Sequence, residues 1–256
     1  MYYLKTHIRV VAALLVREMS ARFGSKPGGY AWAVIDPAGH IAFMSLIFMA
    51  ITHTPALGKS FPLFFATGYL AFQFYAAMAA FLNGAIKANR TLLSYPNVAP
   101  IDTIVARYIL QSGTTSVVSF CVLGVILLTV DQPVTLNWPA IIEAAFAATL
   151  LALGVGIFNN VVCLRSPLYE QVFGIISRPL FLVSGVFFLP DALPGPFREI
   201  VLYNPLVHVV MLFRTGFYPE YRALDMDMFY LYSFAFTIMF VGLFLFTNSV
   251  SVLRSR

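Results

Sequence analysis

The chain alternates between long apolar segments and short polar ones. Segments of about 20 apolar residues cross the ~30 Å hydrocarbon core of a bilayer as helices. One of the six apolar segments, residues 172–189, is barely long enough to do so. The pattern therefore predicts an all-α membrane protein with spans at Tyr30–Ile51, Pro62–Ile86, Ile104–Val130, Pro139–Leu164, Val172–Leu189 and Met228–Val250.

A broken apolar region, residues 190–218, precedes the last span, and its path decides the topology. Prolines interrupt its first part, and Asn204-Pro205 interrupts its second. If the region does not cross, twelve of the sixteen lysines and arginines lie on one side with both termini. If it crosses, Arg254 and Arg256 are exported, against the positive-inside bias. We therefore predict six transmembrane helices, cytoplasmic termini and a re-entrant outer helical hairpin at 190–218.

The first residues favour a helix that lies on the membrane rather than a signal peptide. The short apolar run from Val10 is closed by Arg17 and Glu18, and no small-residue cleavage site follows. At 100° per residue, one apolar stripe forms on a helix over residues 4–23. We expect an amphipathic interface helix, although an ordinary packed helix is an alternative. The stripe consists of Leu4, Ile8, Val11, Leu15 and Met19.

Composition agrees with one transmembrane domain over residues 1–256. Hydrophobic residues make up 60% of the chain and charged residues only 11%, and no stretch is polar and long enough for a soluble domain. We attribute the net charge of +5 to the positive-inside bias and expect membrane lipids, not nucleic acid, as contacts. Cys121 and Cys163 lie in apolar surroundings and predict neither a disulfide framework nor a metal site.

Motifs for nucleotide binding and hydrolytic chemistry are absent from the sequence. The chain carries no Gly-x-x-x-x-Gly-Lys-Ser/Thr loop, no His-Glu-x-x-His, no Cys-x-x-Cys and no Gly-x-Ser-x-Gly. We therefore expect no catalytic residue, no metal and no cofactor in this chain.

A polar, proline-containing segment at residues 89–107 lies between the second and third spans, on the predicted cytoplasmic side. We expect a short helix at about 91–102 that docks on a soluble motor. A solvated loop is the alternative. Pro96 and Pro100 would stiffen the segment. The predicted apolar anchors are Leu92, Leu93, Tyr95 and Val98, and the predicted polar rim is Arg90 and Asp102.

Polar groups inside the predicted spans are candidates for function. Asp36 and His40 are four residues apart and share a helix face. They could form a relay or bind substrate, or they could pair with each other or with Arg22 and Lys26 near the inner headgroups. Arg178 could snorkel to the interface or attract an anionic headgroup.

The sequence resembles ABC-2-type permeases, especially those of ATP-driven capsular polysaccharide exporters. The likeness covers nearly the whole chain in order, and its motifs are specific only together. It begins with Arg22-Phe-Gly and Gly29-Tyr-Ala-Trp-Ala, and Pro37 follows. Asn89-Arg-x-Leu-Leu-x-Tyr-Pro-x-Val-x-Pro-x-Asp with Ala106-Arg107 is similar to the family's coupling region. Further likenesses are Arg178-Pro179, Ser184-Gly-Val-Phe-Phe, Leu193-Pro194 and Asn204-Pro-Leu-Val-His208 with Arg214. Met211 departs from the acidic residue of many relatives.

The resemblance implies a homodimer with two separate ATPase subunits, which hold ATP and Mg²⁺. It implies export of a lipid-linked polysaccharide across the bacterial inner membrane, with a periplasmic adaptor and an outer-membrane conduit. The cargo would pass between the first and fifth spans of two subunits, with outer gate helices at 190–218. We place along this path Tyr30, Trp32, Asp36, His40, Arg178, Phe187, Phe188, His208 and Arg214.

Other functions remain open at this point. The permease could carry O-antigen, teichoic acid or a drug. An integral-membrane enzyme acting on lipid-linked sugars would have Asp36 and His40 as its only candidate pair. A secondary transporter predicts inverted repeats, and the sequence has none that we can detect.

Overall fold

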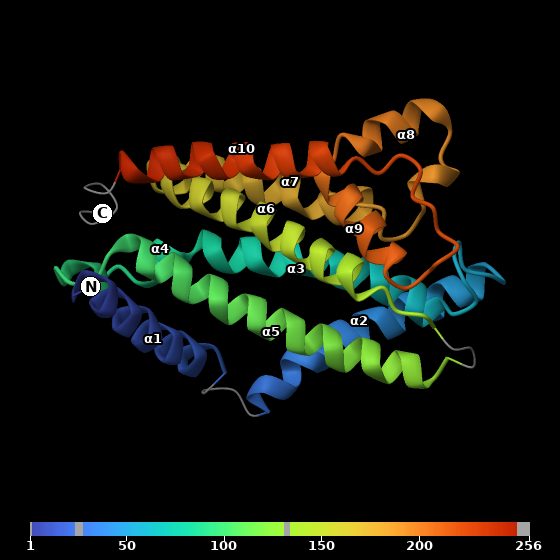
Figure 1. The fold of residues 1–256 in the computed structure, drawn as a ribbon, viewed down its shortest axis with the longest axis horizontal. Helices are drawn as coiled ribbons and strands as arrows, with labels where there is room; N and C mark the ends of the chain where they lie inside the picture. Colours follow the sequence, from blue (N-terminus) through green and yellow to red (C-terminus); the bar gives the residue numbers. More distant parts are fainter. Residues whose placement is uncertain (1, 24–27, 131–133, 250–256) are drawn as a thin grey trace.

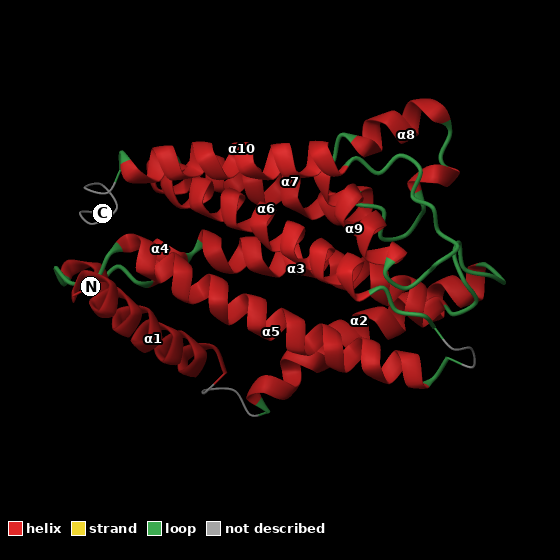
Figure 2. Ribbon diagram, in the orientation of Figure 1, coloured by secondary structure: helices red, strands yellow, loops and turns green. Residues whose placement is uncertain are grey.

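The computed structural model describes residues 2–23, 28–130 and 134–249, and these residues form helices joined by loops, without a strand (Figures 1 and 2). Val250, the tail arginines and Lys26 lie outside this range, as do residues 131–133, which follow the predicted third span. The helices are α1 Tyr2–Phe23, α2 Gly29–Ile51, α3 Phe61–Asn83, α4 Ala85–Ala88, η1 Leu92–Ser94, α5 Pro100–Leu128, α6 Trp138–Arg165, α7 Pro167–Val183, η2 Pro190–Ala192, α8 Gly195–Leu202, α9 Pro205–Thr215 and α10 Met228–Thr247.

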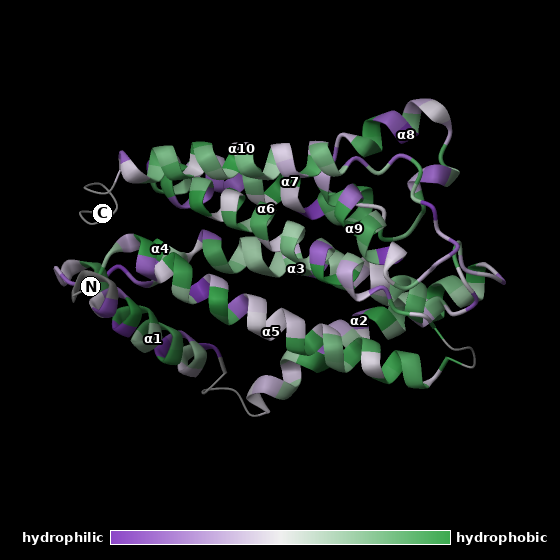
Figure 3. Ribbon diagram, viewed as in Figure 1, coloured by the Kyte–Doolittle hydropathy of each residue, from purple (hydrophilic) through white to green (hydrophobic). Residues whose placement is uncertain are grey.

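Five helices in the described ranges are long and apolar enough to cross a membrane: α2, α3, α5, α6 and α10. The hydrophobic colour runs along them in Figure 3. The predicted fifth span is a shorter helix, because α7 has 17 residues and ends at Val183. The region predicted as an outer hairpin contains the short helices η2, α8 and α9.

Several predicted boundaries were wrong, and local chemistry explains them. The second span, predicted to reach Ile86, stops at Asn83, and a new short helix follows Gly84. The third begins at Pro100 rather than Ile104. Proline suits the first turn of a helix, because a backbone N–H there has no hydrogen-bond partner within the helix. The fifth begins at Pro167 rather than Val172 for the same reason.

Helix α3 is the centre of the bundle, and it packs against α2, α5, α6 and α9. Two glycines of α6 permit close packing against two different helices, α3 and α10. A Cβ atom at Gly156 would lie 2.5 Å from Leu82 Cβ of α3. A Cβ atom at Gly154 would lie 2.7 Å from Ile238 Cγ2 of α10. The close approach of neighbours predicted at these glycines is confirmed, but the two glycines contact different helices rather than form one narrow face.

The beginning of α1, the short α4 and the end of α10 lie at one end of the bundle, and α8 and α9 lie at the other (Figure 1). This arrangement agrees with an even number of crossings. We call the first the inner end and the second the outer end.

Helix α1 packs against α5 by a face that differs from the predicted stripe. Leu14 and Glu18 are buried, whereas Ile8 and Met19 of the stripe are exposed. Glu18 lies inward because an arginine of α5 binds its carboxylate, as described below, and this interaction turns the helix. The exposed side of α1 thus retains part of the apolar stripe.

We expect Gly154→Ala to lower stability by about 1–3 kcal/mol, because the added methyl group overpacks the contact between α6 and α10. The thermal unfolding temperature in detergent measures this change. Gly113→Ala on α5 is the control, since a Cβ atom there meets nothing within 4 Å and alanine favours the helix. Equal unfolding temperatures for the two variants would contradict the packing argument.

Candidate functional site

The segment between α4 and α5, which we call the coupling segment (residues 89–99), is not the continuous helix that the sequence predicted. It contains one 3-10 turn, η1, and then extended backbone at Tyr95 and Ala99. These two residues precede Pro96 and Pro100, and a following proline disfavours helical backbone. The prolines therefore end the turn and set the direction in which α5 begins.

The predicted anchors of this segment point in different directions. Tyr95 is 60% exposed, whereas Leu93 is only 2% exposed and belongs to the chain's own core. Leu92 and Val98 are half-buried, and Arg90 and Pro96 are exposed. A partner approaching this end would meet Tyr95 first, while Leu93 fastens the segment to the bundle.

Asp102 is buried rather than placed on an exposed rim. Its carboxylate accepts a hydrogen bond from the Ala99 N–H at 3.0 Å, which caps the first turn of α5. His7 Nδ1 of α1 lies 3.0 Å from the same carboxylate. Asp102 therefore connects α5 to α1 beside the coupling segment.

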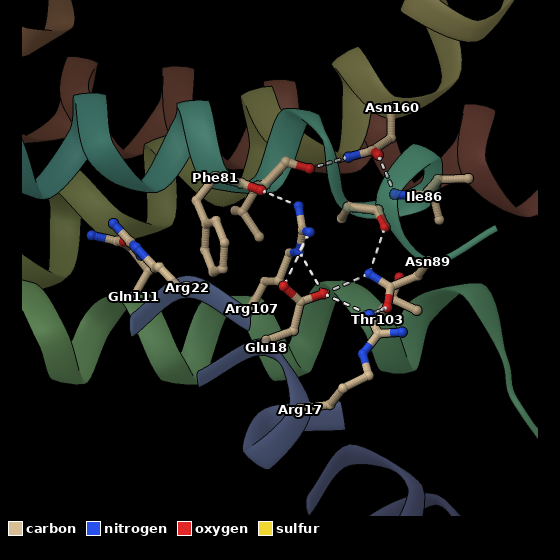
Figure 4. A network of polar contacts seen from close by, with 12 residues as sticks. Arg17, Glu18, Arg22, Phe81, Ile86, Asn89, Thr103, Arg107, Gln111 and Asn160 are labelled. Carbon is tan, nitrogen blue, oxygen red and sulfur yellow. Dashed lines mark hydrogen bonds and ion pairs between the residues drawn. The ribbon is translucent and has the colours of Figure 1, made fainter. Parts of the chain in front are cut away.

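A buried polar cluster joins α1, the coupling segment and α5 (Figure 4). Arg107 Nε lies 3.1 Å from Glu18 Oε1, and Arg107 Nη2 donates to Glu18 Oε2 at 3.1 Å. Asn89 Nδ2 donates to Glu18 Oε1 at 2.8 Å, and Arg17 donates to both Asn89 and Glu18. The two-point contact between Arg107 and Glu18 fixes their relative orientation as well as their separation.

The same arginine also reaches α3. Arg107 Nη1 donates to the Phe81 carbonyl at 2.8 Å, and its guanidinium lies 4.6 Å from the centre of the Phe81 ring. Burial by itself would raise the pKa of Glu18. Hydrogen bonds from Arg107 and Asn89 and the charges of Arg107 and Arg17 lower that pKa below its ordinary value. The carboxylate is thus ionised at neutral pH.

Asn160 of α6 compensates for the break between α3 and α4. Its side-chain nitrogen donates to the carbonyls of Leu82 and Gly156, both at 2.7 Å, and its oxygen accepts from the Ile86 N–H at 3.1 Å. The bonds to Leu82 and Ile86 satisfy backbone groups that the break at Gly84 leaves without helical partners.

The sequence did not reveal the roles of Glu18, Asn89 and Asn160. One signal was available, because Glu18 is a lone acidic residue beside the apolar stripe of α1. An acidic residue there requires a buried cation, but the sequence offered many cations and no means to choose Arg107.

The residues predicted for a substrate path separate into two groups. The first gathers where α2, α3 and α7 meet. The His40 ring stacks on Tyr69 at 4.5 Å between centres and meets Phe181 edge-on at 5.6 Å. Phe187 also meets Phe181, at 5.0 Å, and Phe188 is half-buried. The exposed members of this group are Tyr30, Trp32, Asp36 and Arg178.

The second group, His208 and Arg214, is enclosed by the chain's own atoms at the outer end. Arg214 donates to the carbonyls of Gly185, Val186 and Phe188 at 2.7–3.0 Å. His208 Nδ1 accepts from the Asp227 N–H at 3.0 Å. Its Nε2 therefore carries the proton and donates to the Leu202 carbonyl at 2.9 Å. The neighbouring Met211 is fully buried. The side chains of His208 and Arg214 therefore hold outer loops in place.

We expect Glu18→Ala to destabilise the protein by about 3 kcal/mol, because Arg107 would remain buried without its carboxylate. Thermal unfolding of the purified protein measures the effect. Glu170→Ala is the control, since Glu170 is exposed near the same end of the bundle. A loss no larger than that of the control would show that the cluster does not hold α1.

Known proteins resemble this chain over most of its length. The ABC-2 type transporter family matches residues 9–218. The polysialic acid transport protein KpsM of Escherichia coli is 31% identical over 96% of this chain and 95% of its own length. The capsule polysaccharide export inner-membrane protein BexB of Haemophilus influenzae is 27% identical over 83% of this chain and 80% of its own. The O-antigen export system permease protein RfbA of Klebsiella pneumoniae is 22% identical, over 78% and 77% respectively. By the extent of these matches, the chain belongs to the ABC-2 type transporter family.

Proposed function

We propose that this chain is the permease of an ABC transporter that exports a lipid-linked capsular polysaccharide across the bacterial inner membrane. The observation that carries the proposal is the likeness to KpsM over almost the whole length of both proteins. The chain is a transport subunit, and a separate ATPase supplies the driving force through ATP and Mg²⁺. RfbA supports export of O-antigen as a second candidate, at lower identity.

The permease acts as a homodimer with two ATPase subunits. The exposed faces of α2 and α7 favour this assembly. No residue of α7 is buried within the chain, and both helices carry large apolar side chains on their surfaces. A second copy at these faces would enclose a path between them. A periplasmic adaptor and an outer-membrane conduit would receive the cargo.

In this proposal α7 is the fifth of six crossings, α8 and α9 form the re-entrant outer hairpin, and α1 lies in the cytoplasmic interface. Both termini are cytoplasmic. The exposed apolar residues of α1, Ile8 and Met19, support contact with the headgroup layer.

The buried cluster gives the ATPase a mechanical connection to the bundle. A partner that displaces the coupling segment moves Asn89, and Asn89 is bonded to Glu18 of α1. Glu18 is bonded in turn to Arg107 of α5, which reaches the carbonyl of Phe81 in α3. The displacement therefore reaches three helices through short, charge-assisted contacts.

Tyr95→Ala should abolish co-purification of the chain with its ATPase, because it removes the most exposed aromatic side chain of the coupling segment. Affinity purification of the tagged permease measures the amount of bound ATPase. Tyr203→Ala is the matched control, since Tyr203 is 76% exposed at the outer end. Normal ATPase binding by the Tyr95 variant would exclude this docking surface.

Labelling should place the coupling segment in the cytoplasm. A membrane-impermeant maleimide should react with Ser94→Cys only in inverted vesicles and with Arg222→Cys only in intact spheroplasts. Both residues are exposed, Ser94 in η1 after α4 and Arg222 in the loop after α9, and α4 and α9 lie at opposite ends of the bundle (Figure 1). Cys121 and Cys163 are first replaced by serine. The reverse pattern would invalidate the topology.

A further inference from the structure

A pocket of about 200 Å³, lined by both polar and apolar side chains, lies between α2, α3 and α5. Trp32 and Asp36 of α2 form one wall, Gln73 of α3 lies on another, and Gln111 and Thr114 of α5 lie opposite. Arg22 of α1 lies at its edge. None of the functions assigned to the coupling segment uses this pocket.

The depth of the pocket makes its polarity informative. Gln73 is 12 residues from the start of α3 and Thr114 is 14 residues from the start of α5. At 1.5 Å per residue, both lie about 20 Å along helices of membrane-spanning length. Polar side chains at such a depth face the bundle interior or a water-filled cavity, where they pair with one another or with other polar groups.

Contacts among the lining residues hold several polar groups in place. Arg22 donates to the side-chain oxygen of Gln111, and Gln111 Nε2 donates to Thr115 Oγ1 at 2.7 Å. Gln73 Nε2 donates to the Tyr69 hydroxyl at 2.7 Å. Asp36 takes part in none of the ion pairs found in the described ranges, which leaves a carboxylate able to accept hydrogen bonds.

These groups suit a sugar. Sugar hydroxyls both donate and accept, so one ring can satisfy a carboxylate, an amide and a hydroxyl together. The apolar face of the same ring can lie on the indole of Trp32. An apolar molecule in the pocket would leave the Asp36 carboxylate without a hydrogen-bond partner, which is costly for a charged group. The small volume limits the occupant to a single ring.

We propose that this pocket binds one sugar residue of the exported glycan on its way through the permease. The inference rests on the proposed function, because it names a contact site for that cargo. Asp36 and the amide of Gln73 would bind hydroxyls, and Trp32 would lie against the ring.

The first test measures whether water reaches the pocket and whether the glycan occupies it. In a variant with Cys121 and Cys163 replaced by serine, Thr114→Cys should react with a small water-soluble maleimide. The reaction should be slower in cells that synthesise the glycan than in cells in which its synthesis is blocked. Thr237→Cys on the exposed face of α10 should not react. Equal reactivity at the two positions would overturn the proposal. So would a reaction rate at Thr114→Cys that is the same with and without glycan synthesis.

The second test measures export with matched variants. Thr114 and Thr237 each donate a hydroxyl hydrogen bond to the carbonyl four residues earlier, at 2.8 and 2.7 Å. Their replacement by valine therefore disturbs α5 and α10 alike. Thr114→Val and Asp36→Asn should each reduce surface glycan about tenfold, as expected for the loss of a hydrogen bond to a bound polar ligand. Thr237→Val and Glu143→Gln should leave the amount of surface glycan unchanged.

Two outcomes separate failure of the pocket from failure of the proposed function. If deletion of the gene leaves surface glycan unchanged, the proposed function is wrong and the pocket proposal with it. If deletion abolishes surface glycan but both pocket variants export normally, the function stands and the pocket proposal fails. Membrane abundance of each variant, measured by immunoblot, excludes loss through misfolding.

Discussion

The ion pair between Glu18 and Arg107 is the interaction on which the inner end of this protein depends. Two charged groups removed from water require close pairing and further hydrogen bonds, and here Asn89, Arg17 and the Phe81 carbonyl supply them. The pair determines which face of α1 is buried. It also attaches α1 and α5 to the coupling segment, so these elements form one unit rather than three.

The sequence predicted five helices of membrane-spanning length, because hydrophobic length is a direct physical requirement of the bilayer. It also predicted the close approach of neighbouring helices at Gly154 and Gly156. It failed where one side chain decides the local structure. The proline-directed backbone at Tyr95 and Ala99 was mistaken for a helix, although the rule for residues before proline was available.

The outward or inward direction of single side chains was the least predictable feature. Leu93 and Tyr95 are two residues apart, and both are apolar enough to bind a partner. Only the packing of the segment on the bundle shows that Leu93 points inward. Arg214 gave the same difficulty. A charge near a predicted path suggests a substrate contact, but this guanidinium is buried within the chain and donates to backbone carbonyls.

The interruption at Gly84 has a mechanical consequence. A continuous helix through this point would transmit a push along its axis as a rigid rod. The interruption instead leaves a pivot spanned by the amide of Asn160, which is anchored on α6. In the proposed transporter, a push on α4 would bend the chain at this pivot rather than slide α3 along its axis.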